Sequence, residues 1–272
     1  HKYCTACELN RTIPDLSDAE NFPKWQKLEV AKHRLVYQLL KLELAIPPQE
    51  TNPEIGLCFD FISRQGDNQI MTGHANGLIT ILLSEADSVH REQMRKQMSE
   101  PYRTLIGHFR HEVGHYFWDR LVANNEKRLT EFRNLFGDDR LDYGEALKNY
   151  YRTGAPANWQ QTYISKYASS HAWEDWAETW AHYLHIMDMA ETAYYYGISV
   201  NPNVNEKSIK GSFTFDPYEK RDFEKIYQSW APISFAINSL NRSMGVPDAY
   251  PFVVSSAVVT KMKFIHKLIY NL

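Results

Sequence analysis

Residues 110–119 read RHEVGHYFWD and contain the pattern HExxH at positions 111–115. On a helix, side chains four residues apart lie on the same face, so His111 and His115 can direct two imidazoles at one Zn²⁺ ion. Glu112 lies about 100° around the helix from His111, where its carboxylate can take a proton from an activated water and later deliver it to a leaving amine. The spacing therefore predicts a zinc site with Glu112 as the general base.

The residues around this motif predict one continuous helix over positions 99–122, with Ser99 as its cap and Pro101 in its first turn. Its apolar residues share one face: Leu105, Ile106, Phe109, Val113, Tyr116 and Phe117. Its imidazoles and carboxylates gather on another: His108, His111, Glu112, His115 and Asp119. Two isolated histidines at this spacing are often only surface or core residues that form no site. A face of histidines and acids opposite a core stripe is poorly explained by packing alone.

Composition sets limits on the partners. The chain has 272 residues, 43% of them apolar, which is enough for one large domain, and we expect one. With 30 basic and 33 acidic residues, the net charge of -3 gives no electrostatic case for a nucleic-acid partner. Apolar runs fall far short of the about 20 residues of a membrane span, and nothing at the start resembles a signal peptide. We expect a cytoplasmic protein without a membrane partner.

The cysteines also favour a reducing compartment, because Cys4, Cys7 and Cys58 cannot all pair. Cys4 and Cys7 have the CxxC spacing of half a zinc site, but no second CxxC completes four ligands. Since the chain starts at His1, we expect a fragment whose missing part carries the other cysteines. Cys58, in an apolar run, is expected to be a small buried residue.

The order of elements predicts helices around a small sheet. We expect a helix over positions 24–44 and then strands over 55–63 and 69–83, with positions 73–77 as a turn that contains His74. Positions 78–83 would form an edge strand beside the HExxH helix, where an extended substrate can pair with the backbone. Helical patterns follow over 131–151 with a break at 137–139, and then over 159–168, 218–242 and 253–270.

A second informative stretch, YASSHAWEDWAETWAHYLH, covers residues 167–185. As a helix it places five polar side chains in one quadrant: His171, Glu174, Glu178, His182 and His185. A solvated surface face is the alternative, but three tryptophans in the same stretch argue for burial. We therefore expect this helix to supply the third zinc ligand. Tyr167 and His171, just before Glu174, are candidate donors to a developing oxyanion, although with 17 tyrosines in the chain a structural role for any one of them is more common.

Four stretches carry a resemblance to a known family: LNRTIPDLSD, EPYRTLIGHFRHEVGHYFWDRL, YASSHAWEDWAETWAHYLHIMD and NRSMGVPDAYPFV. They resemble a bacterial family of zinc-binding metallopeptidases, and the resemblance runs nearly end to end. It implies a zincin-like peptidase domain over residues 17–272. It also implies a zinc-ribbon region upstream, of which residues 1–16, with Cys4 and Cys7, would be the last part. The resemblance implies a reaction class and no substrate.

A looser resemblance is to the gluzincins, in which HExxHxxxD is joined by a glutamate from a later helix and, four residues on, by another acid. This resemblance implies Glu174 as the third ligand. Glu178 and Asp119 would then support the ligand histidines through hydrogen bonds.

Together these observations predict a mainly helical α+β zincin-like domain with a small antiparallel or mixed sheet beside the HExxH helix. One Zn²⁺ ion, held by His111, His115 and Glu174, would hydrolyse a peptide or protein substrate. Three alternatives remain open. One is a metal-binding regulatory or interaction protein in which His108, His171 or His185 fills the water position, and another is a zinc hydrolase that cleaves a non-peptide amide. The third is a nucleic-acid partner bound through the missing ribbon, which the near-neutral charge does not support.

Overall fold

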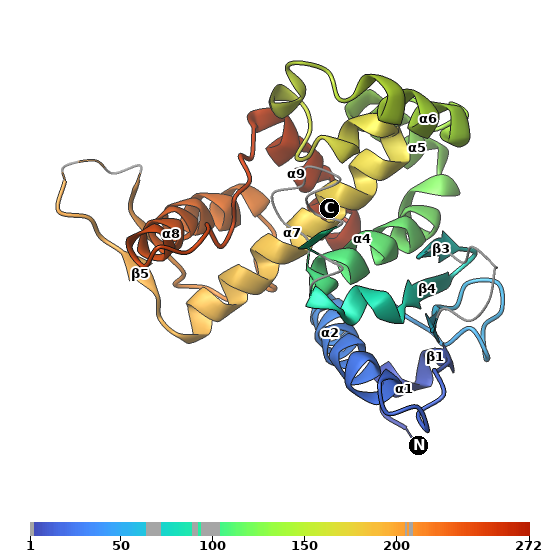
Figure 1. Cartoon of the computed structure of the whole chain (residues 1–272). Coiled ribbons are helices and arrows are strands. Elements are labelled where there is room, and N and C mark those ends of the chain that lie inside the picture. The colour runs from blue at the N-terminus through green and yellow to red at the C-terminus, as the bar shows by residue number, and fades with distance from the viewer. Residues whose placement is uncertain (1–2, 64–71, 89–91, 94–103, 205, 207–208) are drawn as a thin grey trace. The chain divides into compact units, whose positions relative to one another are not determined.

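The computed structural model describes residues 3–63, 72–88, 92–93, 104–204, 206 and 209–272. The chain divides into two compact units, His1–Asn134 and Leu135–Leu272. Helices dominate both units, and the first unit also contains a small mixed sheet, so the predicted α+β class is confirmed (Figure 1). The predicted limits of a ribbon remnant at 1–16 and a peptidase domain at 17–272 stay predictions.

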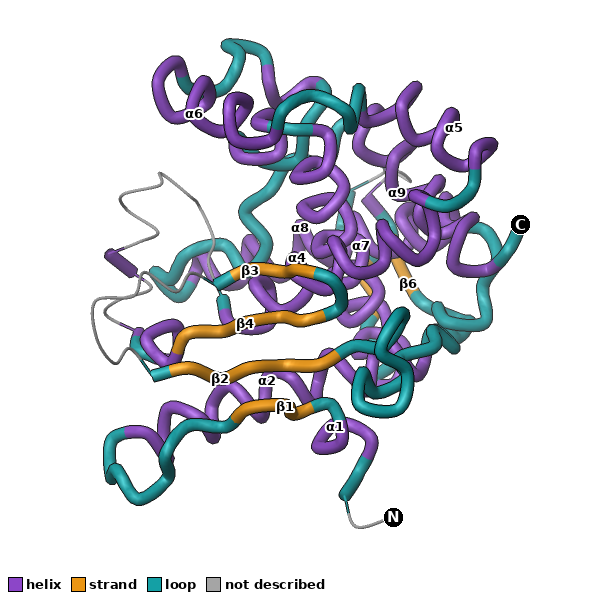
Figure 2. The backbone as a smooth tube through the Cα atoms, turned by 90° about the vertical axis from the view of Figure 1, so that its right-hand side faces the viewer, coloured by secondary structure: helices purple, strands orange, loops and turns teal. Residues whose placement is uncertain are grey.

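The sheet of the first unit has four strands in the order β1-β2-β4-β3 (Figure 2). Its two central strands are β2 (Cys58–Ile62) and β4 (Leu78–Leu82), which pair in parallel. The strand β1 (Asn10–Thr12) pairs in parallel with β2, and β3 (Gly73–Ala75) pairs antiparallel with β4. Strand β4 is therefore an inner strand, and the prediction that residues 78–83 form the edge was wrong.

The reason lies in the two residues between β3 and β4. Asn76 has a φ of 49° and Gly77 a φ of 79°, the left-handed pair that closes a two-residue hairpin. A Cβ atom at Gly77 would lie 2.1 Å from the carbonyl oxygen of Gly56, so only glycine fits there. The Asn-Gly pair folds residues 73–75 back as a strand and makes them the edge, although the sequence pattern had suggested a longer turn.

Two long helices of this unit, α2 (Asn21–Lys41) and α4 (Leu105–Trp118), pack against each other. The ring of Phe109 on α4 lies 5.8 Å from that of Phe59 and 6.3 Å from that of Phe61, on alternate residues of β2. The ammonium of Lys32 on α2 lies over the same two rings. Both helices thus cover one face of the sheet, and α4 is anchored on it by its apolar stripe.

Helix α4 begins later than its sequence pattern suggested. Thr104 has an extended backbone, with φ -121° and ψ 157°, and its side-chain oxygen accepts a hydrogen bond from the backbone N–H of Gly107 at 3.1 Å. A residue with an extended backbone lies outside a helix, and here it caps the start of α4. The prediction of one continuous helix from 99 to 122 was therefore wrong. The predicted cap Ser99 and the first-turn Pro101 lie outside the described residues. After Trp118 the chain widens into a π-helical turn, η2 (Asp119–Ala123), before α5 (Glu126–Phe136).

The second unit consists mainly of the helices α6 (Tyr143–Thr153), α7 (Ala172–Tyr195), α8 (Phe223–Ser243) and α9 (Ser256–Tyr270), with a small β5–β6 pair at Ser199–Val200 and Gly211–Ser212. Instead of the helix predicted over 159–168, two 3-10 turns form, η3 (Trp159–Gln161) and η4 (Tyr167–Ser170). Helix α7 packs on α8 and α9, and its Trp176 and Trp180 are fully buried. The prediction that the tryptophans bury this helix is confirmed.

Among the described residues, none of the helices combines the length and apolar character that crossing a bilayer requires.

Candidate metal centre

Helix α4 brings the two histidines of the HExxH motif together. The ring centroids of His111 and His115 lie 4.9 Å apart, with the ring planes at 84° to each other. On the other side of the helix, Phe109 and Val113 are fully buried, so packing sets the rotation of α4 about its axis. Two imidazoles one helical turn apart can bind one metal ion, as the motif predicted.

Glu112, between these histidines, is buried and contacts His108 one turn earlier on α4. Its Oε1 lies 3.3 Å from Nε2 of His108, while Nδ1 of His108 lies 3.5 Å from Oε2 of Glu85. Glu85 belongs to the short helix η1 (Leu83–Ala86), which directly follows β4. His108 is therefore held between two carboxylates. The sequence analysis missed Glu85, because no local spacing connects it with the HExxH motif.

These contacts set the charges around Glu112. Burial by itself would lower the pKa of His108, but the hydrogen bonds and negative charges of Glu112 and Glu85 outweigh it and raise this pKa to about 9. Burial by itself would raise the pKa of Glu112, but the bond from His108 and the charges of nearby imidazoles lower it below its usual value. Glu112 is thus a carboxylate at neutral pH, the form that a general base needs.

Two other polar residues of the first unit lie near the motif. The ring of His74, on edge strand β3, stacks 6.4 Å from that of His115. Its Nε2 accepts a hydrogen bond from the backbone N–H of Gly77 at 3.1 Å, and burial lowers its pKa to about 4, so it is neutral. Asp119 lies in the π-helical turn that follows α4, and burial raises its pKa. Its predicted support of a ligand histidine stays a prediction.

In the second unit, Glu174 lies in the first turn of α7 and is almost fully buried. Its Oε1 accepts a hydrogen bond of 2.6 Å from the hydroxyl of Tyr143, the first residue of α6. The sequence analysis missed Tyr143, which lies 31 residues away with no motif to mark it. Glu178, one turn further along α7, accepts a 2.6 Å hydrogen bond from the hydroxyl of Ser165. The two glutamates thus have different hydroxyl partners.

The candidate oxyanion donors lie just before α7. Tyr167 is in η4, its ring is 5.9 Å from that of Tyr150, and burial, aided by the charge of Glu174, raises its pKa far above the usual value. It is a neutral phenol. His171 caps α7: its Nδ1 accepts from the backbone N–H of Trp173 and its Nε2 donates to the carbonyl of Leu141, both at 3.1 Å. Donation from His171 to a substrate would require one of these bonds to break.

The other two histidines on α7 do not form one site with the first turn. The Nδ1 atom of His182 lies 2.8 Å from the hydroxyl of Tyr250, and its ring packs 4.2 Å from that of Phe252. The ring of His185 lies 5.7 Å from that of His182. His182 is therefore part of an aromatic cluster, two turns away from Glu174.

The donor set fits zinc. Two neutral imidazoles from α4 and a carboxylate suit Zn²⁺ better than Mg²⁺ or Ca²⁺, which prefer shells of oxygen atoms. A site with three protein ligands leaves a fourth position for water, which is the arrangement of a hydrolytic centre.

Comparison with known proteins agrees with this chemistry. A family model described as "Putative zinc-binding metallo-peptidase" matches residues 21–268. An uncharacterized protein of Mycobacterium bovis and one of Mycobacterium tuberculosis are each 44% identical to the chain over 266 residues, which are 98% of this chain and 75% of the relative. No solved structure matches.

Proposed function

The chain belongs to the zinc-binding metallo-peptidase family, and we propose that it is a zinc-dependent peptidase with a zincin-like fold. One zinc ion would be held by His111, His115 and Glu174, and the substrate would be a peptide or a protein. The observation that carries this proposal is the nearly perpendicular pair of imidazoles on α4, together with the buried carboxylate of Glu112 on the same helix.

The residues of the site have separate roles in the proposed reaction. When bound, zinc supplies the Lewis acidity that makes water a nucleophile at neutral pH. Glu112 takes the proton from that water on a carboxylate oxygen and passes it to the amine that leaves. His108, itself held by Glu85, keeps this carboxylate oriented and ionised. Tyr167, a neutral phenol, and His171 are our candidate donors to the oxyanion; donation from His171 would require one of its two ring hydrogen bonds to break.

Glu174 is our choice for the third ligand. Its carboxylate is buried at the start of α7, where such a charge is costly without partners, and the hydroxyl of Tyr143 holds one of its oxygens. A ligating carboxylate is commonly hydrogen-bonded in this way, because the bond fixes the orientation of the ligand. The gluzincin-like spacing supports the same choice, with Glu178 and Asp119 as supports of the ligand histidines.

The test combines zinc content with hydrolysis. The purified chain should hold about one zinc ion at this site and should cleave members of a peptide library or casein. Glu112→Gln should retain zinc and lose hydrolysis, because the amide preserves the shape of the carboxylate but cannot accept a proton. His111→Ala is the matched variant that should lose zinc and hydrolysis together.

Two results would contradict the proposal. Loss of zinc from Glu112→Gln would mean that Glu112 is a ligand and not the base. Full zinc content without cleavage of any peptide would favour a metal-binding protein or a hydrolase of a non-peptide amide, and a metal-edge anomalous map showing four protein ligands would decide for the former.

A further inference from the structure

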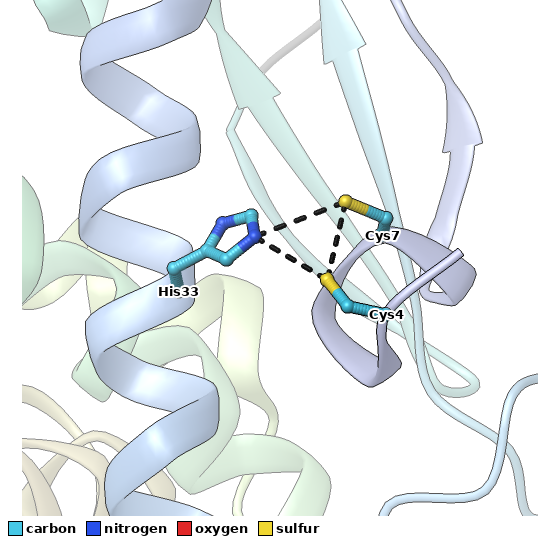
Figure 3. Close-up of side chains that lie close together, drawn as sticks. All are labelled: Cys4, Cys7 and His33. Carbon is cyan, nitrogen blue, oxygen red and sulfur yellow. Dashed lines mark hydrogen bonds between the residues drawn. The ribbon is translucent and has the colours of Figure 1, made fainter.

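The beginning of the chain holds a second group of side chains that can bind a metal, beside the middle of α2. Cys4 directly precedes the short helix α1 (Thr5–Glu8), Cys7 belongs to it, and His33 lies in the middle of α2. Figure 3 shows the two sulfurs and the imidazole facing one another. The sulfur atoms are 3.4 Å apart, and Nε2 of His33 lies 3.6 Å from that of Cys4 and 3.8 Å from that of Cys7.

These separations match a tetrahedral zinc site. With Zn–S bonds of about 2.3 Å and a Zn–N bond of about 2.0 Å, two sulfurs would be about 3.8 Å apart and a sulfur and a nitrogen about 3.5 Å apart. Each observed distance lies within about 0.4 Å of these values. The sulfurs are also well beyond the about 2.05 Å of a disulfide bond, and all three cysteines of the chain are free. The three atoms therefore already occupy three corners of one tetrahedron.

The imidazole is held in the tautomer that a metal requires. Nδ1 of His33 lies 2.8 Å from the backbone carbonyl oxygen of Glu29, which can only accept a hydrogen bond. The proton is therefore on Nδ1, and Nε2 presents its lone pair to the two sulfurs. The carboxylate of Glu29 lies 3.4 Å from the same Nδ1. A carbonyl or carboxylate behind a histidine is the usual support of a metal ligand, because it fixes the ring and raises its basicity.

The thiols are also accessible to a metal. Cys4 is exposed and Cys7 partly exposed, so an ion can reach both sulfurs. The thiolate is the form of cysteine that binds zinc.

We propose that Cys4, Cys7 and His33 bind a zinc ion that fastens helix α1 to helix α2, with the fourth position filled by solvent or by one further ligand. A ribbon built from two CxxC pairs would not use a histidine of α2, so His33 separates this site from the ribbon that the sequence suggested. The proposal is independent of the peptidase function, because every ligand comes from outside the HExxH motif.

Cobalt provides the test, because Co²⁺ replaces Zn²⁺ in tetrahedral sites and thiolate ligands give it an intense near-ultraviolet charge-transfer absorption. The reduced, metal-free chain of 272 residues is titrated with Co²⁺ alone. The HExxH site has no sulfur ligand, so this absorption reports only on cysteines. We expect it to saturate at about one ion per chain and to disappear when Zn²⁺ is added. Cys58→Ser, which changes the remaining cysteine, should leave it unchanged.

The ligand variants decide the role of His33. His33→Ala should weaken cobalt binding by more than the about 10- to 100-fold that loss of a supporting residue costs, and His33→Cys should restore tight binding through three thiolates. Cys4→Ser and Cys7→Ser should each reduce the charge-transfer absorption. A His33→Ala chain with the absorption and affinity of the unaltered chain would overturn the proposal, and so would cobalt binding with no thiolate absorption. Restored binding in His33→Cys would exclude misfolding as the reason for loss in His33→Ala.

Discussion

Nε2 of His108 lies 3.3 Å from Oε1 of Glu112, one turn apart on α4, while Glu85 approaches the other ring nitrogen of His108 from η1. The expected general base therefore has a positively charged neighbour that is itself held by a second carboxylate. This chain of three residues gives Glu112 a defined orientation, and its removal should affect turnover without affecting the metal.

For His108→Ala, we expect kcat to fall about 10- to 100-fold, the usual effect of losing a residue that orients a participant in a metal site. KM and zinc content should stay close to those of the unaltered chain, because His108 is not a proposed ligand. Steady-state kinetics on a cleaved peptide, with zinc measured on the same sample, checks this. Loss of zinc would instead show that His108 is a ligand, as in the metal-binding alternative.

Alanine variants of Glu174 and Glu178 should differ in zinc affinity when they are compared in a zinc competition titration. Glu174→Ala removes a proposed ligand, whereas Glu178→Ala removes a support whose loss is expected to cost about 10- to 100-fold in zinc affinity. The first variant should therefore bind zinc much more weakly than the second. The reverse order would show that the two roles are exchanged. Tyr143→Phe deletes only the hydroxyl bonded to Glu174, so its zinc affinity should be closer to that of Glu178→Ala than to that of Glu174→Ala.

The hairpin turn at Gly77 should be sensitive to any side chain. Gly77→Ala places a Cβ atom 2.1 Å from the Gly56 carbonyl oxygen at a φ of 79°, so we expect the free energy of unfolding to fall by about 1–3 kcal/mol. Gly73, four residues earlier, has open space around the corresponding position, and Gly73→Ala is the matched control that should cost little. Urea unfolding of the two variants checks this prediction, and equal stabilities would contradict it.

His266 should make the stability of the second unit dependent on pH. Burial lowers its pKa to about 4, and its Nδ1 lies 2.9 Å from the hydroxyl of Tyr183. The unfolded chain takes up a proton near the usual value of about 6.5, whereas the folded chain does not. The neutral imidazole therefore contributes stability above this value, and that contribution is lost as the pH falls from about 6.5 to about 4.

The slope from this one group should reach about 1.4 kcal/mol per pH unit within that window. In His266→Gln the slope between pH 6.5 and 4 should be smaller by that amount, while other titrating groups contribute equally to both proteins. Urea unfolding at a series of pH values measures the difference. Parallel curves for the two proteins would mean that His266 is not kept neutral by burial.

Local patterns in the sequence predicted a large part of this protein. The pairing of His111 with His115, and the place of Glu112 between them, follow from helical spacing, which acts over four residues. The burial of Trp176 and Trp180, the break after Phe136 and the helices of the second unit also follow from local periodicity and turn residues. The sequence also predicted a turn at positions 73–77, but the Asn-Gly pair at 76–77 confines that turn to two residues and leaves residues 73–75 as a strand.

Only the tertiary structure decided the contacts between distant segments. Nε2 of His33 meets a cysteine sulfur 29 residues away, the hydroxyl of Tyr143 meets Glu174 across 31 residues, and Glu85 reaches His108 from another element. Sequence spacing carries no information on such pairs, because packing determines which faces of two elements meet. By itself the sequence determined the HExxH pattern and the helical spacing of its two histidines and its glutamate; the three-dimensional packing determined which residues contact that glutamate and which histidine faces the amino-terminal cysteines.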